Sequence, residues 1–330
     1  GLTDKDFGRV YIWVNVNRHT QRDGKYIDYP IIVFKSYQAT YGEPTESFNT
    51  LSELFDLYKD YRTNGFFTKS VCKVDENEIK KQRELVSIEQ ANKKIKVGKH
   101  LKKEKLRFLK LPSLGSNKSL FSPYTNQKKT TLAAKKLQEI KVGSDKDGYF
   151  TCFPLYNIKG DFQGLQRIYH IKPESWDDNK KFSWGLNPVG SMFVIGSLKD
   201  SEMCYIVEGL CTGLSMRMAT GKTVVIALNA NNIEPVSGNI SKKYPNCKRV
   251  HVADNDNIKV HHGNTGVFKC SKAVKNHGGF VFVPRPSKGV DANDVHVFDG
   301  LAVLKAQIKD ESNYFNGRLS VNVGAIFNWL

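Results

Sequence analysis

The sequence contains no long hydrophobic run. Nowhere does it approach the ~20 consecutive apolar residues that a membrane-spanning helix requires. Its first residues also lack the basic segment followed by an apolar run that marks a secretory signal. We therefore expect a cytoplasmic protein with no membrane partner.

Closely spaced cysteines are also missing. The six cysteines are scattered and no Cys-x-x-Cys pair occurs, which argues against a zinc ribbon in this sequence. Isolated cysteines are typical of reduced cytoplasmic proteins. Cys204, Cys211 and Cys270 lie in apolar-rich segments, so we expect them to be small buried thiols.

Acidic residues are scarce relative to basic ones. The chain has 50 Lys and Arg against 33 Asp and Glu, a net charge of +17. Between Lys73 and Lys141 the counts are 19 and 7, so this segment alone carries 19 − 7 = +12. A solvated linker could have this composition, but contact with nucleic acid explains the excess better.

The apolar fraction of 40% is that of a globular protein, and 330 residues suffice for two or three domains. Residues 1–72 read as a small α+β domain of unknown role, with strands at 10–14 and 29–34, a turn at Asp23-Gly24 and a helix at 52–61. Residues 73–100 form a basic helical connection, because Ile88, Ala91 and Ile95 recur at helical spacing.

Residues 101–200 are rich in predicted strands, at 150–158 and 164–171, with shorter ones near Phe182 and at 192–195. The polar stretch 117–130 has no periodic signal and is predicted to be a mobile loop.

Residues 201–310 alternate strands and helices. Strands are expected at 203–207, 224–228, 249–253 and 280–283, separated by helices that include 266–276, and 311–330 would be a C-terminal extension. This alternation predicts a parallel sheet with helices on both faces. Ligands of such sheets bind at the carboxyl ends of the strands.

Acidic residues follow three of these strands: Glu208, Asp254, Asp256, Asp291 and Asp294. A single Asp after a strand is usually a cap or turn residue. Clustered carboxylates, however, resist joint ionisation unless cations neutralise them. Mg²⁺ or Mn²⁺, as two ions, would suit such an oxygen-rich rim and would support phosphoryl transfer.

Three segments resemble the motifs of the TOPRIM fold: 205–209, which ends in Glu-Gly, 250–256, which ends in Asp-Asn-Asp, and 264–266. Within that superfamily the pattern is most similar to DnaG-type primases of phages and plasmids. They share the Glu-Gly start of the first helix, a turn like 229–232 and an acidic element like 289–294. The resemblance extends over about 130–310.

The resemblance implies that Glu208, Asp254 and Asp256 are catalytic metal ligands, with Asp291 and then Asp294 near a second metal position. Thr212 stands where cellular primases carry an acidic residue. The segment after Asp256 is longer than in the family, and its two histidines, His261 and His262, are read as part of a surface loop rather than as ligands.

The segments 164–168 and 180–182, with Gly190 beyond them, resemble the preceding lobe of the same polymerase core. Candidates for contact with template or nucleotide phosphates are Arg167, Lys180, Lys181 and Gly209. Three aromatic residues, Trp184, Phe182 and Tyr169, could stack on bases, although aromatics in strands are more often part of a core.

These observations favour a DNA primase: a nucleotidyltransferase that makes primers from nucleoside triphosphates on single-stranded DNA during phage or plasmid replication, in the cytoplasm of a bacterial host. A replicative helicase, fused or separate, is an expected partner. Two alternatives stay open: a TOPRIM metal-dependent nuclease, and a catalytically degenerate DNA-binding module.

Overall fold

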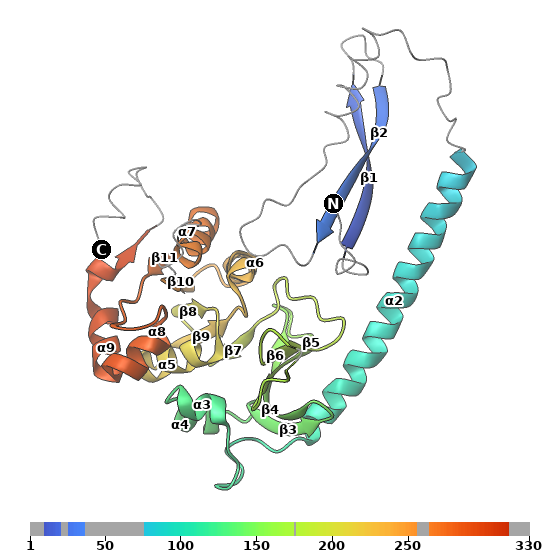
Figure 1. The fold of residues 1–330 in the computed structure, drawn as a ribbon. Helices are drawn as coiled ribbons and strands as arrows, with labels where there is room; N and C mark the ends of the chain where they lie inside the picture. Colours follow the sequence, from blue (N-terminus) through green and yellow to red (C-terminus); the bar gives the residue numbers. More distant parts are fainter. Residues whose placement is uncertain (1–9, 21–25, 37–75, 175, 256–263, 317–330) are drawn as a thin grey trace. The chain divides into compact units, whose positions relative to one another are not determined.

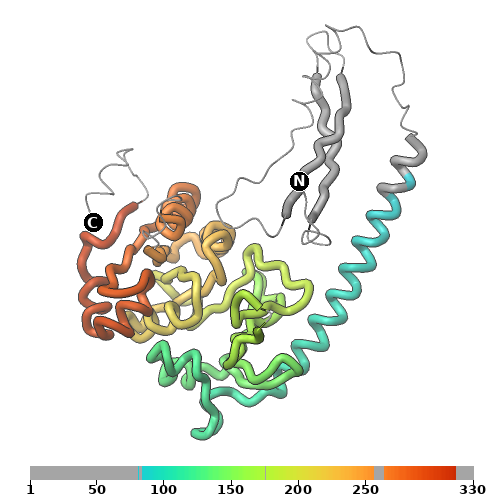
Figure 2. Tube along the Cα trace, in the orientation of Figure 1, coloured from blue at the N-terminus to red at the C-terminus, as the bar shows by residue number. Residues whose placement is uncertain are grey.

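The protein is described by a computed structural model, drawn as a ribbon in Figure 1 and as a tube in Figure 2. The described residues are 10–20, 26–36, 76–174, 176–255 and 264–316. The chain divides into two compact units, 1–84 and 85–330. The predicted lobe and α/β region both fall in the second unit, and their separation as domains stays a prediction.

The first unit contains an antiparallel hairpin of β1 (Val10–Thr20) and β2 (Tyr26–Ser36). Val10 pairs with Ser36 and Thr20 with Tyr26, so both strands are longer than predicted. The expected turn at Asp23-Gly24 and the helix at 52–61 lie outside the described residues.

The predicted basic connection is helix α2 (Glu76–Lys110). Side chains from 84 to 96 are exposed, as expected of a connecting helix. The helix does not end by residue 100, which corrects the predicted boundary. Its last turns continue because Phe108 and Glu104 are buried, 4% and 5% exposed, against the sheet that follows.

That sheet is an antiparallel meander in the order β3-β4-β5-β6. Its strands are β3 (Lys141–Asp145), β4 (Gly148–Tyr156), β5 (Phe162–Tyr169) and β6 (Lys180–Phe182). The last three were predicted, whereas β3 was not. They confirm the strand-rich character of the lobe.

The polar stretch predicted as a mobile loop is instead folded, so that expectation was wrong. It contains α3 (Pro123–Gln127) and leads into α4 (Thr131–Lys135). Ser122 is fully buried and caps α3, and the hydroxyl group of Thr151 in β4 donates to Ser122 Oγ over 2.7 Å. Buried hydroxyl groups therefore help to fix this segment, together with Leu120 and Tyr124, which pack against the core.

A second, six-stranded sheet has the order β12-β11-β10-β8-β9-β7. Its strands are β7 (Phe193–Ile195), β8 (Met203–Val207), β9 (Thr223–Ile226), β10 (Lys248–Val252), β11 (Phe280–Phe282) and β12 (Tyr314–Phe315). The central strands β8 to β11 run parallel, as predicted. The edge strands β7 and β12 pair antiparallel, and β12 brings the expected C-terminal extension into the sheet.

Helices cover both faces of this sheet (Figure 1). On one face lie α6 (Ala230–Lys243) and α7 (Thr265–His277). On the other lie α5 (Leu210–Thr220), α8 (Ala292–Asp294) and α9 (Leu301–Lys309), with a π-turn at Val295–Asp299 between the last two. The predicted alternation of strands and helices is confirmed.

Alternate residues of β8 enter two hydrophobic cores. Cys204 and Ile206 pack with residues of α6 and α7, whereas Tyr205 and Val207 belong to a cluster that also includes Phe153 of β4. The second cluster joins the antiparallel and parallel sheets through shared apolar contacts. Cys204, Cys211 and Cys270 are all buried, which confirms the expectation of small internal thiols.

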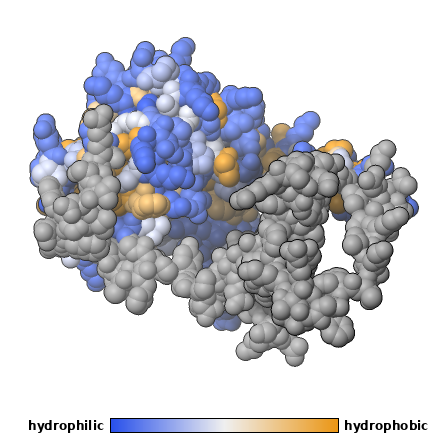
Figure 3. Space-filling view, turned by 90° about the horizontal axis from the view of Figure 1, so that it is seen from above, coloured by the Kyte–Doolittle hydropathy of each residue, from blue (hydrophilic) through white to orange (hydrophobic). Residues whose placement is uncertain are grey.

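The face seen in Figure 3 is largely hydrophilic over the described part of the second unit, with small separate apolar patches. Among the described helices, none combines the length and the apolar character that crossing a bilayer requires.

Candidate active site

The first acidic residue stands where β8 gives way to α5. Glu208 directly follows the strand and is half-buried. Gly209 is the extended N-cap of α5, with φ −106° and ψ 157°. The chain thus turns at once from strand to helix, and Glu208 is held at the carboxyl edge of the sheet beside the N-terminal amides of α5.

Asp254 follows β10, the parallel neighbour of β8. The amide of Ala253 donates to Phe282 O over 2.9 Å, so pairing with the next strand continues up to Asp254. A Cβ atom on Gly266 would lie 2.2 Å from Asp254 O, so glycine alone lets α7 begin this close to the strand end. This explains the glycine of the 264–266 motif.

Asp291 and Asp294 lie in the loop after β11 and form a capping box. The amide of Asp294 donates to Asp291 Oδ1 over 2.8 Å, and the amide of Asp291 donates to Asp294 Oδ2 over 3.3 Å. Gly289 has φ +95°, and a Cβ there would lie 2.2 Å from Asp294 Oδ2. The loop is therefore wound tightly around the Asp294 carboxylate.

Hydrogen bonds connect the three acidic segments. Thr212, in the first turn of α5, donates to Asp291 Oδ2 over 3.0 Å. The amide of Asn255, next to Asp254, donates to Val290 O over 2.7 Å. These bonds link the start of α5 and the end of β10 to the 289–294 loop at one edge of the sheet. The convergence of all five predicted carboxylates on this edge stays a prediction, because Asp256 lies outside the described residues.

Burial and mutual repulsion act on the acidic groups of this edge. Burial, followed by the charge of Asp294, raises the pKa of Asp291 above its ordinary value. Burial raises the pKa of the Cys270 thiol, and the charges of Glu208 and Asp254 raise it further. Both carboxylates therefore lie near enough to Cys270 of α7 to act on its thiol.

Asp294 differs from the other acidic residues because it is surrounded by donors. Its Oδ1 forms an ion pair with Lys128 over 3.3 Å, and its Oδ2 also accepts the amide of Val290 over 2.8 Å. These contacts fit a residue that supports the loop of Asp291. They leave little room for the metal-ligand role that the sequence predicted.

Metal binding can be judged on the donors present. Glu208, Asp254 and Asp291 supply half-buried carboxylate oxygens, the ligand type that Mg²⁺ and Mn²⁺ prefer. Within the described ranges, no three His, Cys, Asp or Glu side chains are grouped closely enough to hold a metal ion. The predicted ligand Asp256 and both histidines, His261 and His262, lie outside those ranges.

Arg167 was predicted to contact phosphate, but its guanidinium group is already paired inside the protein. It forms an ion pair with Glu104 of α2, whose side chain is 5% exposed, and lies 5.5 Å from the centre of the Phe150 ring. The structure therefore gives Arg167 a role in holding α2 against β5. A phosphate contact would require breaking this pair.

Lys180 and Lys181 are more accessible. Their side chains are 42% and 46% exposed, with Asp178 at 3.9 Å from the first and Asp147 at 3.2 Å from the second. Both ion pairs lie at the surface, where such pairs contribute little energy and exchange readily. The two lysines can therefore bind an anion at low cost.

The motifs at Gly190 and 229–232 meet in space. Asn229 caps α6, so the predicted turn is the start of a helix. The buried amide of Asn232 donates to Ser191 O and Ala227 O, both over 2.8 Å, and accepts the Gly190 amide over 2.7 Å. These residues fix the loop before β7 to the α/β region rather than contacting the acidic edge.

Two contacts escaped sequence reasoning. Lys128 lies in the stretch taken for a loop, and its pairing with Asp294 joins positions 166 residues apart. Asn293, fully buried, donates to Lys128 O and Ser215 Oγ, both over 2.9 Å. The Asp-x-Asn-Asp pattern at 291–294 contains Asn293, but only its two carboxylates were predicted to be functional.

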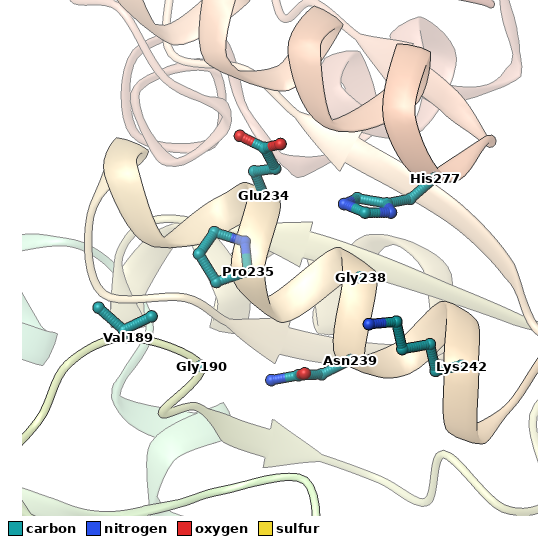
Figure 4. Close-up of a pocket in the computed structure, with 8 residues that line it drawn as sticks. All are labelled: Val189, Gly190, Glu234, Pro235, Gly238, Asn239, Lys242 and His277. Atoms are coloured by element: carbon teal, nitrogen blue, oxygen red, sulfur yellow. The ribbon is translucent and has the colours of Figure 1, made fainter. Parts of the chain in front are cut away.

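A hollow of about 280 Å³ lies away from the acidic edge, between α6, the end of α7 and the Gly190 loop. Figure 4 shows Glu234, Asn239 and Lys242 on α6 and His277 facing them. Glu234 pairs with Lys272 of α7 over 2.9 Å, which lowers its pKa. None of the predicted site residues lines this hollow, so we do not assign the chemistry to it.

Comparison with known proteins gives one family match, the Toprim domain, over residues 203–302. Among solved structures, the zinc-binding and RNA polymerase domains of the Aquifex aeolicus primase are 17% identical. That match covers 91% of this chain and 78% of the other, with a TM-score of 0.42.

The primase fragment of the bacteriophage T7 primase-helicase protein is 14% identical, covers 57% of this chain and 74% of the other, and has a TM-score of 0.40. The RNA polymerase domain of Mycobacterium tuberculosis primase DnaG is also 14% identical, with a TM-score of 0.37. That match covers 53% of this chain and spans only 60% of the mycobacterial domain.

The family match begins at the first residue of β8 and includes β9, β10, α7 and β11. It therefore contains every acidic segment of the edge described above. Residues 203–302 form a Toprim domain, whose parallel sheet carries Glu208 and Asp254 at the carboxyl ends of β8 and β10.

Proposed function

We propose that this chain is a DNA primase, a nucleotidyltransferase that synthesises primers from nucleoside triphosphates on single-stranded DNA. The observation that carries the proposal is the Toprim domain with Glu208 and Asp254 at adjacent parallel strand ends. The apolar core shared with the antiparallel lobe supports it, because a basic lobe fixed beside an acidic edge can present a template to it.

We propose Glu208, Asp254 and Asp256 as the catalytic metal ligands, with Asp291 beside them and two Mg²⁺ or Mn²⁺ ions as the cofactor. Divalent ions bound there would neutralise phosphate charge and stabilise the attacking and leaving oxygens of nucleotidyl transfer. Asp294 would act by positioning Asp291. This assignment follows from its capping box and its ion pair with Lys128.

For the substrate phosphates we propose Lys180, Lys181 and the backbone amides that follow Gly209. The two lysines are exposed, and the start of α5 offers unpaired amide donors beside Glu208. Arg167 contributes to this surface indirectly, by holding α2 to the lobe through Glu104.

We also propose that the enzyme serves a phage or plasmid in the cytoplasm of a bacterial host, with a helicase as partner. The support is the motif beginning at Glu208 and Gly209, which continues through Thr212 as in primases of mobile elements. The T7 protein that shares this fold is itself described as a primase-helicase.

The test is primer synthesis on mixed single-stranded DNA with labelled ribonucleotides or deoxyribonucleotides and either Mg²⁺ or Mn²⁺. The parent should give short labelled products, and the double variant Asp254→Asn/Asp256→Asn should give none. Glu139→Gln/Glu311→Gln, which removes two exposed carboxylates elsewhere, is the matched control and should remain active.

Metal-dependent cutting of the DNA without synthesis would instead support the nuclease alternative. Binding without either reaction in the parent would support the degenerate module. Thr212 in place of an acidic residue and the ion pair at Asp294 are the observations that favour this second alternative.

A further inference from the structure

The second half of α2 carries a strong positive charge that the fold does not neutralise. Between Lys93 and Lys110 there are nine Lys and Arg residues and a single carboxylate, Glu104. Glu104 is buried in its ion pair with Arg167, whereas all nine basic side chains are exposed. The helix therefore presents almost unopposed positive charge to solvent.

Five of these side chains form a line along the helix, which we call the basic stripe. At about 100° per residue they lie within roughly 80° of one another around the axis and extend about 21 Å along it. The stripe consists of Lys96, Lys99, Lys103, Arg107 and Lys110. In the described part of the second unit, no carboxylate lies within 4.0 Å of any of them.

The side of α2 that packs against the rest of the protein is not the side that carries the basic stripe. Val97 is half-buried, and Glu104 and Phe108 are buried. These residues recur at intervals of seven and four and so define their own face of the helix. Packing therefore does not require the charges of the stripe.

An exposed aromatic ring lies beside the same helix. The ring of Trp184 is 5.5 Å from that of His100 in an edge-to-face arrangement, and Trp184 is 53% exposed. The chain directly after Trp184 packs against α2 at Gly185. Gly185 has a φ of +77°, and a Cβ atom added to it would lie 2.5 Å from Val97 Cγ2. The indole is thus fixed next to α2 and still open to solvent.

We propose that the basic stripe and Trp184 bind a single strand of nucleic acid, with consecutive phosphates along α2 and an unpaired base stacked on the indole. This inference deepens the proposed function, on which the identity of the strand as template rests. Aromatic stacking combined with a track of positive charge is the general mode of sequence-independent single-strand binding. A linear row of cations also matches one phosphate backbone.

An acidic protein would be attracted by the same charges, and so would a duplex. The exposed indole of Trp184 distinguishes between these candidate ligands, because only a strand with unpaired bases can stack on it without opening base pairs. The single strand is therefore the occupant that explains both features together.

The test measures fluorescence anisotropy of a labelled oligothymidine strand at several salt concentrations, without nucleotides and with a chelator. The variant Lys96→Gln/Lys103→Gln/Arg107→Gln should lower the slope of log affinity against log salt by about 2, since each phosphate contact on a single strand contributes about 0.7. The control Lys222→Gln/Lys275→Gln/Lys305→Gln removes the same charge from exposed positions elsewhere and should leave the slope unchanged.

Trp184→Ala should weaken binding of the strand about fivefold or more, and Trp184→Phe should retain most of it. Circular dichroism of each variant checks that α2 is intact. Equal salt slopes for the stripe variant and the control variant would overturn the proposal. It would also be overturned if a blunt duplex bound as tightly as the single strand and Trp184→Ala did not change the affinity for the strand.

Failure of this inference and failure of the primase assignment can be told apart. The binding assay contains neither nucleotides nor metal, so stripe-dependent binding by a protein that makes no primers would refute only the primase assignment. Primer synthesis with stripe-independent binding would refute only the binding path.

Discussion

The hydroxyl group of Thr212 donates a hydrogen bond of 3.0 Å to Asp291 Oδ2 across 79 residues of sequence. This bond ties the first turn of α5, just after Glu208, to the loop that carries Asp291. Burial and the charge of Asp294 raise the pKa of the Asp291 carboxyl group, whereas the hydrogen bond from Thr212 favours its charged form. A neutral donor at position 212 thus adds no further repulsion to the acidic edge.

Replacing Thr212 by Val should destabilise the protein at neutral pH by about 1–3 kcal/mol, because a buried charged acceptor loses a donor. The pKa of Asp291 is higher in the folded chain than in the unfolded one, so stability falls as pH rises from the ordinary carboxyl range through the folded pKa. Thr212→Val raises that pKa further and should steepen the fall.

Urea unfolding at a series of pH values measures this effect. Asp291→Asn, which retains an N-cap side chain but cannot ionise, should flatten the same part of the pH profile. A Thr212→Val penalty that is the same at every pH would contradict the electrostatic explanation.

The ion pair between Glu104 and Arg167 makes a second prediction. Glu104→Gln leaves a largely buried guanidinium group without its counter-charge and should cost about 3–5 kcal/mol. Glu89→Gln, on the exposed part of the same helix, should cost almost nothing. Equal unfolding midpoints for the two variants in urea would show that the pair does not anchor α2.

A third prediction concerns the contact between α7 and β10. Gly266→Ala places a Cβ against Asp254 O and should force the helix away, at a cost of about 1–3 kcal/mol, with loss of primer synthesis. Gly98→Ala is the matched control: nothing lies within 4 Å of its Cβ, and it should stabilise α2 by up to about 1 kcal/mol. Thermal unfolding of both variants tests this contrast.

The α/β region could be predicted from sequence because short strand-forming runs alternate with stretches of helical pattern. The run 203–207 is followed by Glu208 and Gly209, and strand β8 ends at Val207 as expected. Parallel pairing then determines the position of the acidic residues, because carboxyl ends of parallel strands meet at one edge. Local pattern and topology therefore agree in this region.

Other features depend on contacts between distant positions. Nothing near Arg167 in sequence indicates Glu104, 63 residues earlier, so an internal ion pair was taken for a phosphate contact. The segment of α3 and α4 shows no regular apolar spacing, and the buried hydroxyl groups of Ser122 and Thr130 contribute hydrogen bonds that help to fix it. Hydrogen bonds of this kind leave no regular spacing in a sequence.

The central claim is that Glu208, Asp254 and Asp256 form a divalent-ion site, and calorimetric titration with Mn²⁺ tests it most directly. The parent should bind Mn²⁺ with a heat that Asp254→Asn/Asp256→Asn abolishes and that Glu139→Gln/Glu311→Gln preserves. Folding of each variant is verified by its unfolding midpoint. Mn²⁺ binding that is unchanged in the folded Asp254→Asn/Asp256→Asn variant would contradict the claim.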